Sequence, residues 1–582
     1  MKLFLRPLLK NELIKLFHRR SCRVMALLML IVAIGTPLLF KLTYVINDRH
    51  NDTTEEYYQK MYNQEEGAVK EMYQAILDDI ALMKNDGIDI NGWRGAYFEY
   101  YLRYANTLNA LEMIERGYEP DEVTSGMRGL PLIQKDPRDG KIKFWHIIEE
   151  HGLDGYYADD VLFRKEDIPK YREEVQVYYD KAKQLLYSGK AEFADLKAAE
   201  YYGKIAAAQA QIKALSGSES DIWERETAEL TIVVYEGAIK CWNAFKTCDE
   251  ENEGWIAKLD ETLLKMAQFG ADDAAAFDKE YFFDENSREY NFYREVYIDK
   301  TLSFDSYEKY TEFMTEAKED FKRAVDMIVF SAENQAPASP SFNSTFRSAK
   351  YVLDMSLNAG LYTVMFCCIF LAAVIMGSEY STGAIRLLLV RPQPRWKILL
   401  SKLMALCIFI AISLTAVYTV TALATTLLYG VGDLDTKITV FKYGKIMAVS
   451  PLQNAIHKGF LGAISMFGIS MLTFMLSLVI KKGAISAAVG AMVFGFGEAV
   501  AEFTRTVLYK VPFLKYTLFP YIMNLEYVEY DPLDRFLMSL DYTPVSAEYG
   551  MELSTGIAVI MLFTAVILML SFAIFDKQQI KN

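Results

Sequence analysis

The sequence predicts an all-α membrane protein with six transmembrane helices, an N-terminal interfacial helix and a large, mainly helical extracellular domain. Six apolar stretches of about 17 to 27 residues can cross, or nearly cross, a hydrocarbon core about 30 Å thick. Between the first and the second stretch lies a long hydrophilic block, residues 46–355. With 582 residues, the chain is also too long for one ordinary core, so at least two structural units are expected.

Charge separates the same two parts of the chain. Residues 46–355 contain about 62 Asp and Glu against about 37 Lys and Arg, whereas the rest contains about 14 acids and about 25 bases. A basic fringe beside apolar segments indicates a cytoplasmic membrane surface, so the lipid bilayer is the expected partner and nucleic acid is not.

Residues 1–21 predict a cytoplasmic amphipathic helix in the membrane interface. Leu9, Leu13 and Leu16 recur at helical spacing, and basic residues occupy the remaining surface. A disordered basic arm is the alternative.

Residues 22–45 predict the first transmembrane helix. A cleaved signal peptide competes with that interpretation, but the charged leader is long and amphipathic and no clear cleavage site follows.

Residues 46–355 predict the extracellular, mostly helical, acidic domain. A capping box of Thr53 and Glu56 precedes an expected helix at 55–84, and Gly117 is a natural stop for the next helix. Further helical stretches are 172–187, 191–215, 221–248, 255–268 and 306–330. Cys241 and Cys248 are too far apart on one continuous helix for a disulfide, so a bridge between them requires the helix to break; both possibilities stay open.

Residues 356–582 supply the other five predicted spans. Their apolar stretches are 360–376, 403–429, 460–480, 484–500 and 553–575. The positive-inside rule places the basic regions 2–23, 386–402 and 481–482 on one side. Both termini are then cytoplasmic and residues 46–355 extracellular, in a multi-pass protein of the cell membrane. The basic loop 430–459 goes against this assignment for the third and fourth spans.

The motifs of several enzyme classes are missing. No G-x-x-x-x-G-K-[ST] phosphate loop occurs in the sequence, so the chain is expected to have no ATPase site of this kind. His146 and His151 are five residues apart, whereas zinc motifs on helices use i and i+4. No catalytic His–nucleophile pair stands out among five histidines. We therefore expect no catalytic residues, no metal and no cofactor.

Two weaker patterns point to ligands. Glu498 and Glu502 lie at the outer end of the fifth span, where acids are costly and often functional, unless the helix has already left the hydrocarbon. Tyrosines recur at helical spacing at 97–104 and 178–187. They belong either to a core or to a surface for a peptide or cell-wall ligand, and the second reading gives an alternative function, a membrane-bound ligand-binding or sensing protein.

The most informative segment is 377–402, between the second and third spans. Five charged residues are too many for a passive hairpin: Glu379, Arg386, Arg391, Arg395 and Lys397. Pro392 and Pro394 stop any helix there. A short amphipathic helix would present this charge to a soluble partner. The alternative is a topology signal without a partner.

The same segment resembles the loop between the second and third helices of ABC-2 type permeases, the membrane subunits of one class of ABC transporter. That pattern is roughly E-[YF]-x-x-G-T-x-R-x-L-L-x-x-P-x-S-R, followed by Lys. The matching positions are Glu379, Tyr380, Gly383, Arg386, Leu388, Leu389, Pro392, Arg395 and Lys402. Ala384 replaces the usual Thr and Pro394 the usual Ser, which puts hydroxyl capping at those points in doubt. The resemblance covers the membrane half, and some Gram-positive members carry an insertion between their first two helices.

The resemblance implies a permease subunit that works with a separate ABC ATPase subunit and a second permease subunit, the same or similar. The residues implied in coupling to the ATPase are Glu379, Tyr380, Gly383, Arg386, Arg391, Pro392 and Arg395. Export is the implied direction. The acidic domain could attract cationic molecules, which suggests a peptide-like or drug-like substrate.

Overall fold

The computed structural model divides the chain into two compact units, residues Met1–Ile46 with Ala338–Asn582, and residues Asn47–Pro337. They are called the membrane unit and the acidic unit below. The described residues are 5–48, 54–90, 92–123, 133–135, 142–144, 161–163, 165–215, 221–260, 262–264, 307–338, 348–386, 394–434, 436–442, 444–507, 511–521, 525 and 552–577.

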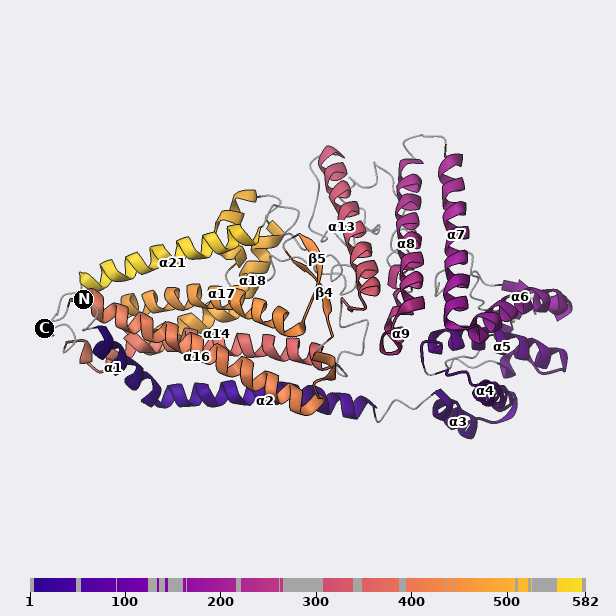
Figure 1. Cartoon of the computed structure of the whole chain (residues 1–582), viewed down its shortest axis with the longest axis horizontal. Helices are drawn as coiled ribbons and strands as arrows, with labels where there is room; N and C mark the ends of the chain where they lie inside the picture. The colour runs from indigo at the N-terminus through magenta and orange to yellow at the C-terminus, as the bar shows by residue number, and fades with distance from the viewer. Residues whose placement is uncertain are drawn as a thin grey trace. The chain divides into compact units, whose positions relative to one another are not determined.

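The membrane unit is a set of long apolar helices (Figure 1). Its helices are α1 (Leu5–His18), α2 (Arg20–Asp48), α14 (Ala349–Ser381), α16 (Arg395–Tyr429), α17 (Pro451–Ile480), α18 (Gly483–Val507) and α21 (Leu553–Asp576). Five of these, α2, α14, α16, α17 and α21, are long and apolar enough to cross a membrane, which confirms five of the predicted spans as candidates. The sixth, predicted at 484–500, falls in α18, whose apolar part is Gly483–Gly497, and it remains a prediction.

Helix α14 forms the centre of the membrane unit, because it packs against α16, α17 and α18 (Figure 1). It comes very close to the start of α18. A Cβ added to Gly377 would lie 2.2 Å from the Cα of Gly483, so the two backbones touch. Helices α2 and α21 instead expose large apolar side chains such as Leu27 and Leu562, 57% and 69% exposed. Such faces suit a lipid environment rather than water.

The acidic unit is mainly helical, as predicted. Its helices are α3 (Thr54–Gln64), α4 (Gly67–Asn85), α5 (Gly95–Glu115), α6 (Ile168–Tyr187), α7 (Lys190–Ala214), α8 (Asp221–Thr247), α9 (Glu250–Ile256) and α13 (Tyr307–Glu333). Gly117 ends α5 with a φ of +110°, which confirms the predicted stop. The helix expected at 55–84 is two helices, because Gly67 has a φ of +66° and the chain turns there.

The all-α prediction is wrong in two places, where short antiparallel strands occur. In the acidic unit, β1 (Ile133–Lys135), β2 (Ile142–Phe144) and β3 (Val161–Phe163) pair in that order. In the membrane unit, β4 (Ile438–Lys442) and β5 (Lys445–Val449) form a hairpin. Gly444, with a φ of +71°, permits the tight turn between them. The remaining elements are the short 3₁₀ helices η1 (Pro120–Glu122), η3 (Lys165–Asp167), η6 (Gly432–Leu434), η7 (Pro512–Tyr516) and η8 (Phe519–Tyr521).

Aromatic residues and cysteines are among the buried residues of the acidic unit. Tyr101 and Tyr104 are 2% and 4% exposed, which favours the core interpretation of that tyrosine stripe. Cys241 and Cys248 are free, buried thiols. Burial raises the pKa of the Cys241 thiol, which keeps it protonated and unreactive.

One carboxylate in the acidic unit is surrounded by three ammonium groups. Glu200 Oε1 lies 2.8 Å from Lys204 Nζ, and Glu200 Oε2 lies 3.7 Å from Lys197 Nζ and 3.9 Å from Lys181 Nζ. Burial acts to raise the pKa of Glu200, but the three lysines outweigh it and lower that pKa to about 2. This cluster links α6 to α7 inside the unit.

Candidate functional site

The informative segment between the second and third spans has well-defined ends. Helix α14 stops because Gly383 adopts a φ of +73°, and its amide donates to the carbonyl of Tyr380 at 3.2 Å. Helix α16 then begins after Pro394, which provides no side-chain cap. A Ser at this point would be able to cap the helix, so the replacement noted in the sequence removes a possible hydrogen bond.

Three helices bring their charged side chains together beside this segment. Lys402, in the second turn of α16, is buried, and its ammonium donates to Glu12 Oε2 on α1 at 2.9 Å and to Glu379 Oε1 on α14 at 3.1 Å. The side chain of Lys402 is 0% exposed, and those of Glu12 and Glu379 are 10% and 5% exposed. We call Glu12, Lys15, Glu379 and Lys402 the charge cluster.

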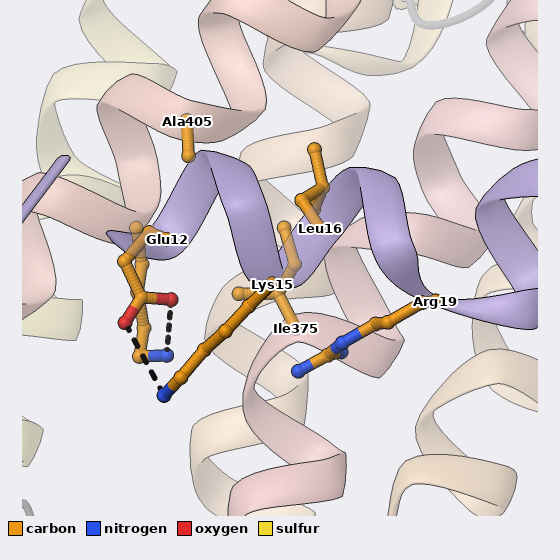
Figure 2. A pocket seen from close by; sticks show the side chains of 7 residues that line it. Glu12, Lys15, Leu16, Arg19, Ile375 and Ala405 are labelled. Carbon is orange, nitrogen blue, oxygen red and sulfur yellow. Dashed lines mark hydrogen bonds and ion pairs between the residues drawn. The ribbon is translucent and has the colours of Figure 1, made fainter. Parts of the chain in front are cut away.

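Lys15 completes the charge cluster from its edge. Its Nζ lies 3.6 Å from Glu379 Oε1 and 3.9 Å from Glu12 Oε1, and its side chain is 45% exposed. Figure 2 shows Glu12, Lys15 and Arg19 turned to the same side of the helix. Two carboxylates therefore face two ammonium groups, so the charges within the cluster balance.

This arrangement is a structural tie between helices rather than a ligand pocket. The hollow lined by Glu12, Lys15, Arg19 and Lys402 has a volume of about 10 Å³, which is room for about one water molecule. Buried charges persist only when they are paired, and removing one partner of a buried pair costs about 3–5 kcal/mol. Since Glu379 and Lys402 flank the segment, the charge cluster attaches both of its ends to α1.

The other predicted coupling residues have different surroundings. Tyr380 is half-buried against the core of the membrane unit. Arg386 is exposed. Arg395 donates from Nη1 to the backbone carbonyl of Asp576 at 2.5 Å, so it joins the start of α16 to the end of α21, where a cation is favourable. Arg391 and Pro392 lie outside the described residues.

Glu379 is thus enclosed among charges of its own chain, although it was expected at or near a docking surface. Glu498 and Glu502 both belong to α18, but their side chains lie outside the described part of the chain. The structure therefore brings Glu379 together with Glu12, Lys15 and Lys402, and does not bring Glu379 together with Arg386.

Sequence reasoning missed the contribution of Glu12. One signal was present: Glu12 is the only acid among the basic residues of 1–23. Lys402 was noticed as part of a basic region and of the motif, but without a partner. Within the described ranges, no group of three or more His, Cys, Asp and Glu residues could hold a metal ion. The pair His146 and His151 lies outside those ranges.

The fold and the site define a polytopic membrane protein whose N-terminal helix is attached by buried charges to its central helices. Residues 326–580 match the profile of a family described as "Protein of unknown function (DUF2705)". The chain is also 24% identical over 271 residues to "Uncharacterized protein YhcI" of Bacillus subtilis (strain 168), covering 46% of this chain and 78% of that relative. No solved structure matches the chain.

Proposed function

We propose that the chain is the membrane-spanning permease subunit of an ATP-driven exporter, and that a separate ATPase subunit and a second permease subunit complete the transporter. The supporting observation is the way the segment 382–394 is attached. Lys402 and Glu379 tie its two ends to α1, and Arg395 ties α16 to α21. A push on this segment by a soluble ATPase would therefore move four helices together.

In this proposal the residues of the motif divide into two roles. Arg386 is exposed and available to a partner, whereas Glu379 is a positioning residue inside the chain. Five helices that are long and apolar enough to cross a membrane support a location in the membrane. Cytoplasmic termini, an extracellular acidic unit and a peptide-like or drug-like substrate complete the proposal.

The alternative of a ligand-sensing protein loses part of its support. The tyrosine stripe of α5 that would have offered a ligand surface places Tyr101 and Tyr104 in the core. The dense charge cluster beside an inter-span segment is also better suited to transmitting a mechanical signal than to binding a small molecule, because its hollow is so small.

Co-purification from the native membrane tests the proposal. The full chain should bring down a Walker-type ATPase, and Arg386→Glu should weaken that association about tenfold by reversing one charge at the rim of the interface. Lys482→Glu is the matched control, because Lys482 is exposed in another short inter-span link, between α17 and α18. Equal retention of the ATPase by both variants, or absence of any ATPase with the unsubstituted chain, would contradict the proposal.

A further inference from the structure

Three arginines gather where α1 meets α2. Helix α1 ends at His18 and α2 begins at Arg20, so Arg19 forms an elbow between them. The amide of Arg19 donates to the carbonyl of Leu16 at 3.2 Å, and the amide of Arg23 donates to the carbonyl of Arg19 at 3.3 Å. Because α2 is apolar enough to span a membrane, its first turns lie at a boundary between hydrocarbon and headgroups.

Two of these arginines lack an acidic partner among the described residues. Arg20 and Arg23 are exposed, and the structure shows no salt bridge from either within the described ranges. Arg23 donates from Nη2 to the backbone carbonyl of His18 at 3.2 Å. A guanidinium group has five N–H donors, so this bond leaves most of the donors of Arg23 available.

The exposed arginines continue into an exposed apolar stripe. Arg20, Arg23, Val24 and Leu27 have the spacing i, i+3, i+4 and i+7, so they share one face of α2. Val24 and Leu27 are 66% and 57% exposed. Two cations at the headgroup level followed by an apolar stripe towards the hydrocarbon match a molecule that has an anionic head and an acyl tail.

We propose that this face of α2 binds an anionic phospholipid, with the headgroup phosphate on Arg20 and Arg23 and an acyl chain along Val24 and Leu27. Planar guanidinium groups suit phosphate oxygens through paired N–H donors. A zwitterionic lipid has the same tail but no net charge, so it binds more weakly. The lipid site is separate from the charge cluster, and it does not depend on the proposed transport function.

Native mass spectrometry of the full chain, titrated with phosphatidylglycerol or phosphatidylcholine in detergent, tests this site. Arg20→Gln and Arg23→Gln should each weaken phosphatidylglycerol binding about fivefold, and the double variant about 25-fold, which corresponds to about 1 kcal/mol for each basic residue near an anionic surface. Phosphatidylcholine binding should not change. Arg20→Lys/Arg23→Lys keeps the charge, so its loss should be no more than about threefold.

Lys481→Gln/Lys482→Gln is the matched control, because these two exposed bases lie in the link between α17 and α18. Phosphatidylglycerol binding should survive in this control. An equal loss in both double variants, no loss in the arginine variant, or equally tight binding of both lipids would overturn the proposal. Glycerol phosphate, which has the head without the tail, should not compete. Competition at concentrations equal to those of the lipid would show a free-phosphate site instead.

Discussion

Removal of the Lys402 ammonium is the strongest perturbation of the charge cluster. Lys402→Met keeps a similar length and volume but leaves Glu12 and Glu379 facing each other. Lys15, at 3.9 Å and 3.6 Å, is then their nearest cation, and Arg19 lies farther away. Because Lys402 is 0% exposed and its two contacts are 2.9 Å and 3.1 Å long, the expected loss is about 3–5 kcal/mol. For a unit of this size the unfolding temperature should fall by about 5–8 °C.

Thermal unfolding in detergent with a thiol-reactive dye measures this loss. Cys22, Cys367 and Cys368 are buried in the membrane unit, so the dye reports its opening when the half-buried Cys407 and the two cysteines of the acidic unit, Cys241 and Cys248, are replaced by Ala. The matched control is Lys397→Met, since Lys397 lies on the same helix and its ammonium lies 5.6 Å from the Trp396 ring. We expect a loss of less than about 1 kcal/mol for this control.

A double-mutant cycle separates pairing from general damage to the helix. Glu379→Gln combined with Lys402→Met leaves Glu12 facing Lys15, so the charges again balance. The double variant should be more stable than the sum of the two single losses predicts, by about 2 kcal/mol. Additive losses, or a Lys402→Met loss equal to that of Lys397→Met, would refute the reasoning that a buried pair joins these helices.

Two further perturbations test the packing and the acidic unit. Gly377→Ala should cost about 3 kcal/mol in the dye assay, because its Cβ would collide with the backbone of Gly483. The control Gly495→Ala should cost less than about 0.5 kcal/mol, because nothing lies within 4 Å of the added Cβ. Similar losses in the two variants would contradict this packing. Glu200→Gln should remove the part of the acid sensitivity of the acidic unit that Glu200 contributes. With a folded pKa of about 2 against about 4.5 unfolded, Glu200 contributes about 3 kcal/mol above pH 4.5, and this is lost as pH falls towards 2. Tryptophan fluorescence in a Trp396→Phe background reports this unit, and an unchanged pH profile in Glu200→Gln would contradict the assignment.

Much of the fold follows from local sequence signals. A run of apolar residues defines each of the five candidate spans, because length and hydropathy are properties of one segment. Gly117 stops a helix as expected. Gly67 divides the helix expected at 55–84 into two. The apolar spacing continues across Gly67, so the periodicity of the sequence predicts one helix, and only the positive φ of Gly67 reveals the turn. The β4–β5 hairpin was missed although β-branched residues flank the Gly444 turn, because the segment was treated only as a charged loop.

The charge cluster could be predicted only in part. The motif identified Glu379, Arg395 and Lys402 as positions of interest, but a motif does not say which side chains are buried. The contact of Lys402 with Glu12 joins residues 390 apart in the sequence, and no local pattern encodes the position of α1 against α16. The available signal was Glu12, the single acid in the basic helix α1. Its role depends on Lys402 in another helix, α16.

Site-specific photo-cross-linking at position 386 in cells that carry the chain natively tests the permease assignment most directly. A photoreactive residue there should form an adduct with a protein that contains a Walker phosphate loop, and the same residue at position 482 should form much less of it. Adducts only with proteins that lack a nucleotide-binding motif, or equal yields at the two positions, would contradict the account.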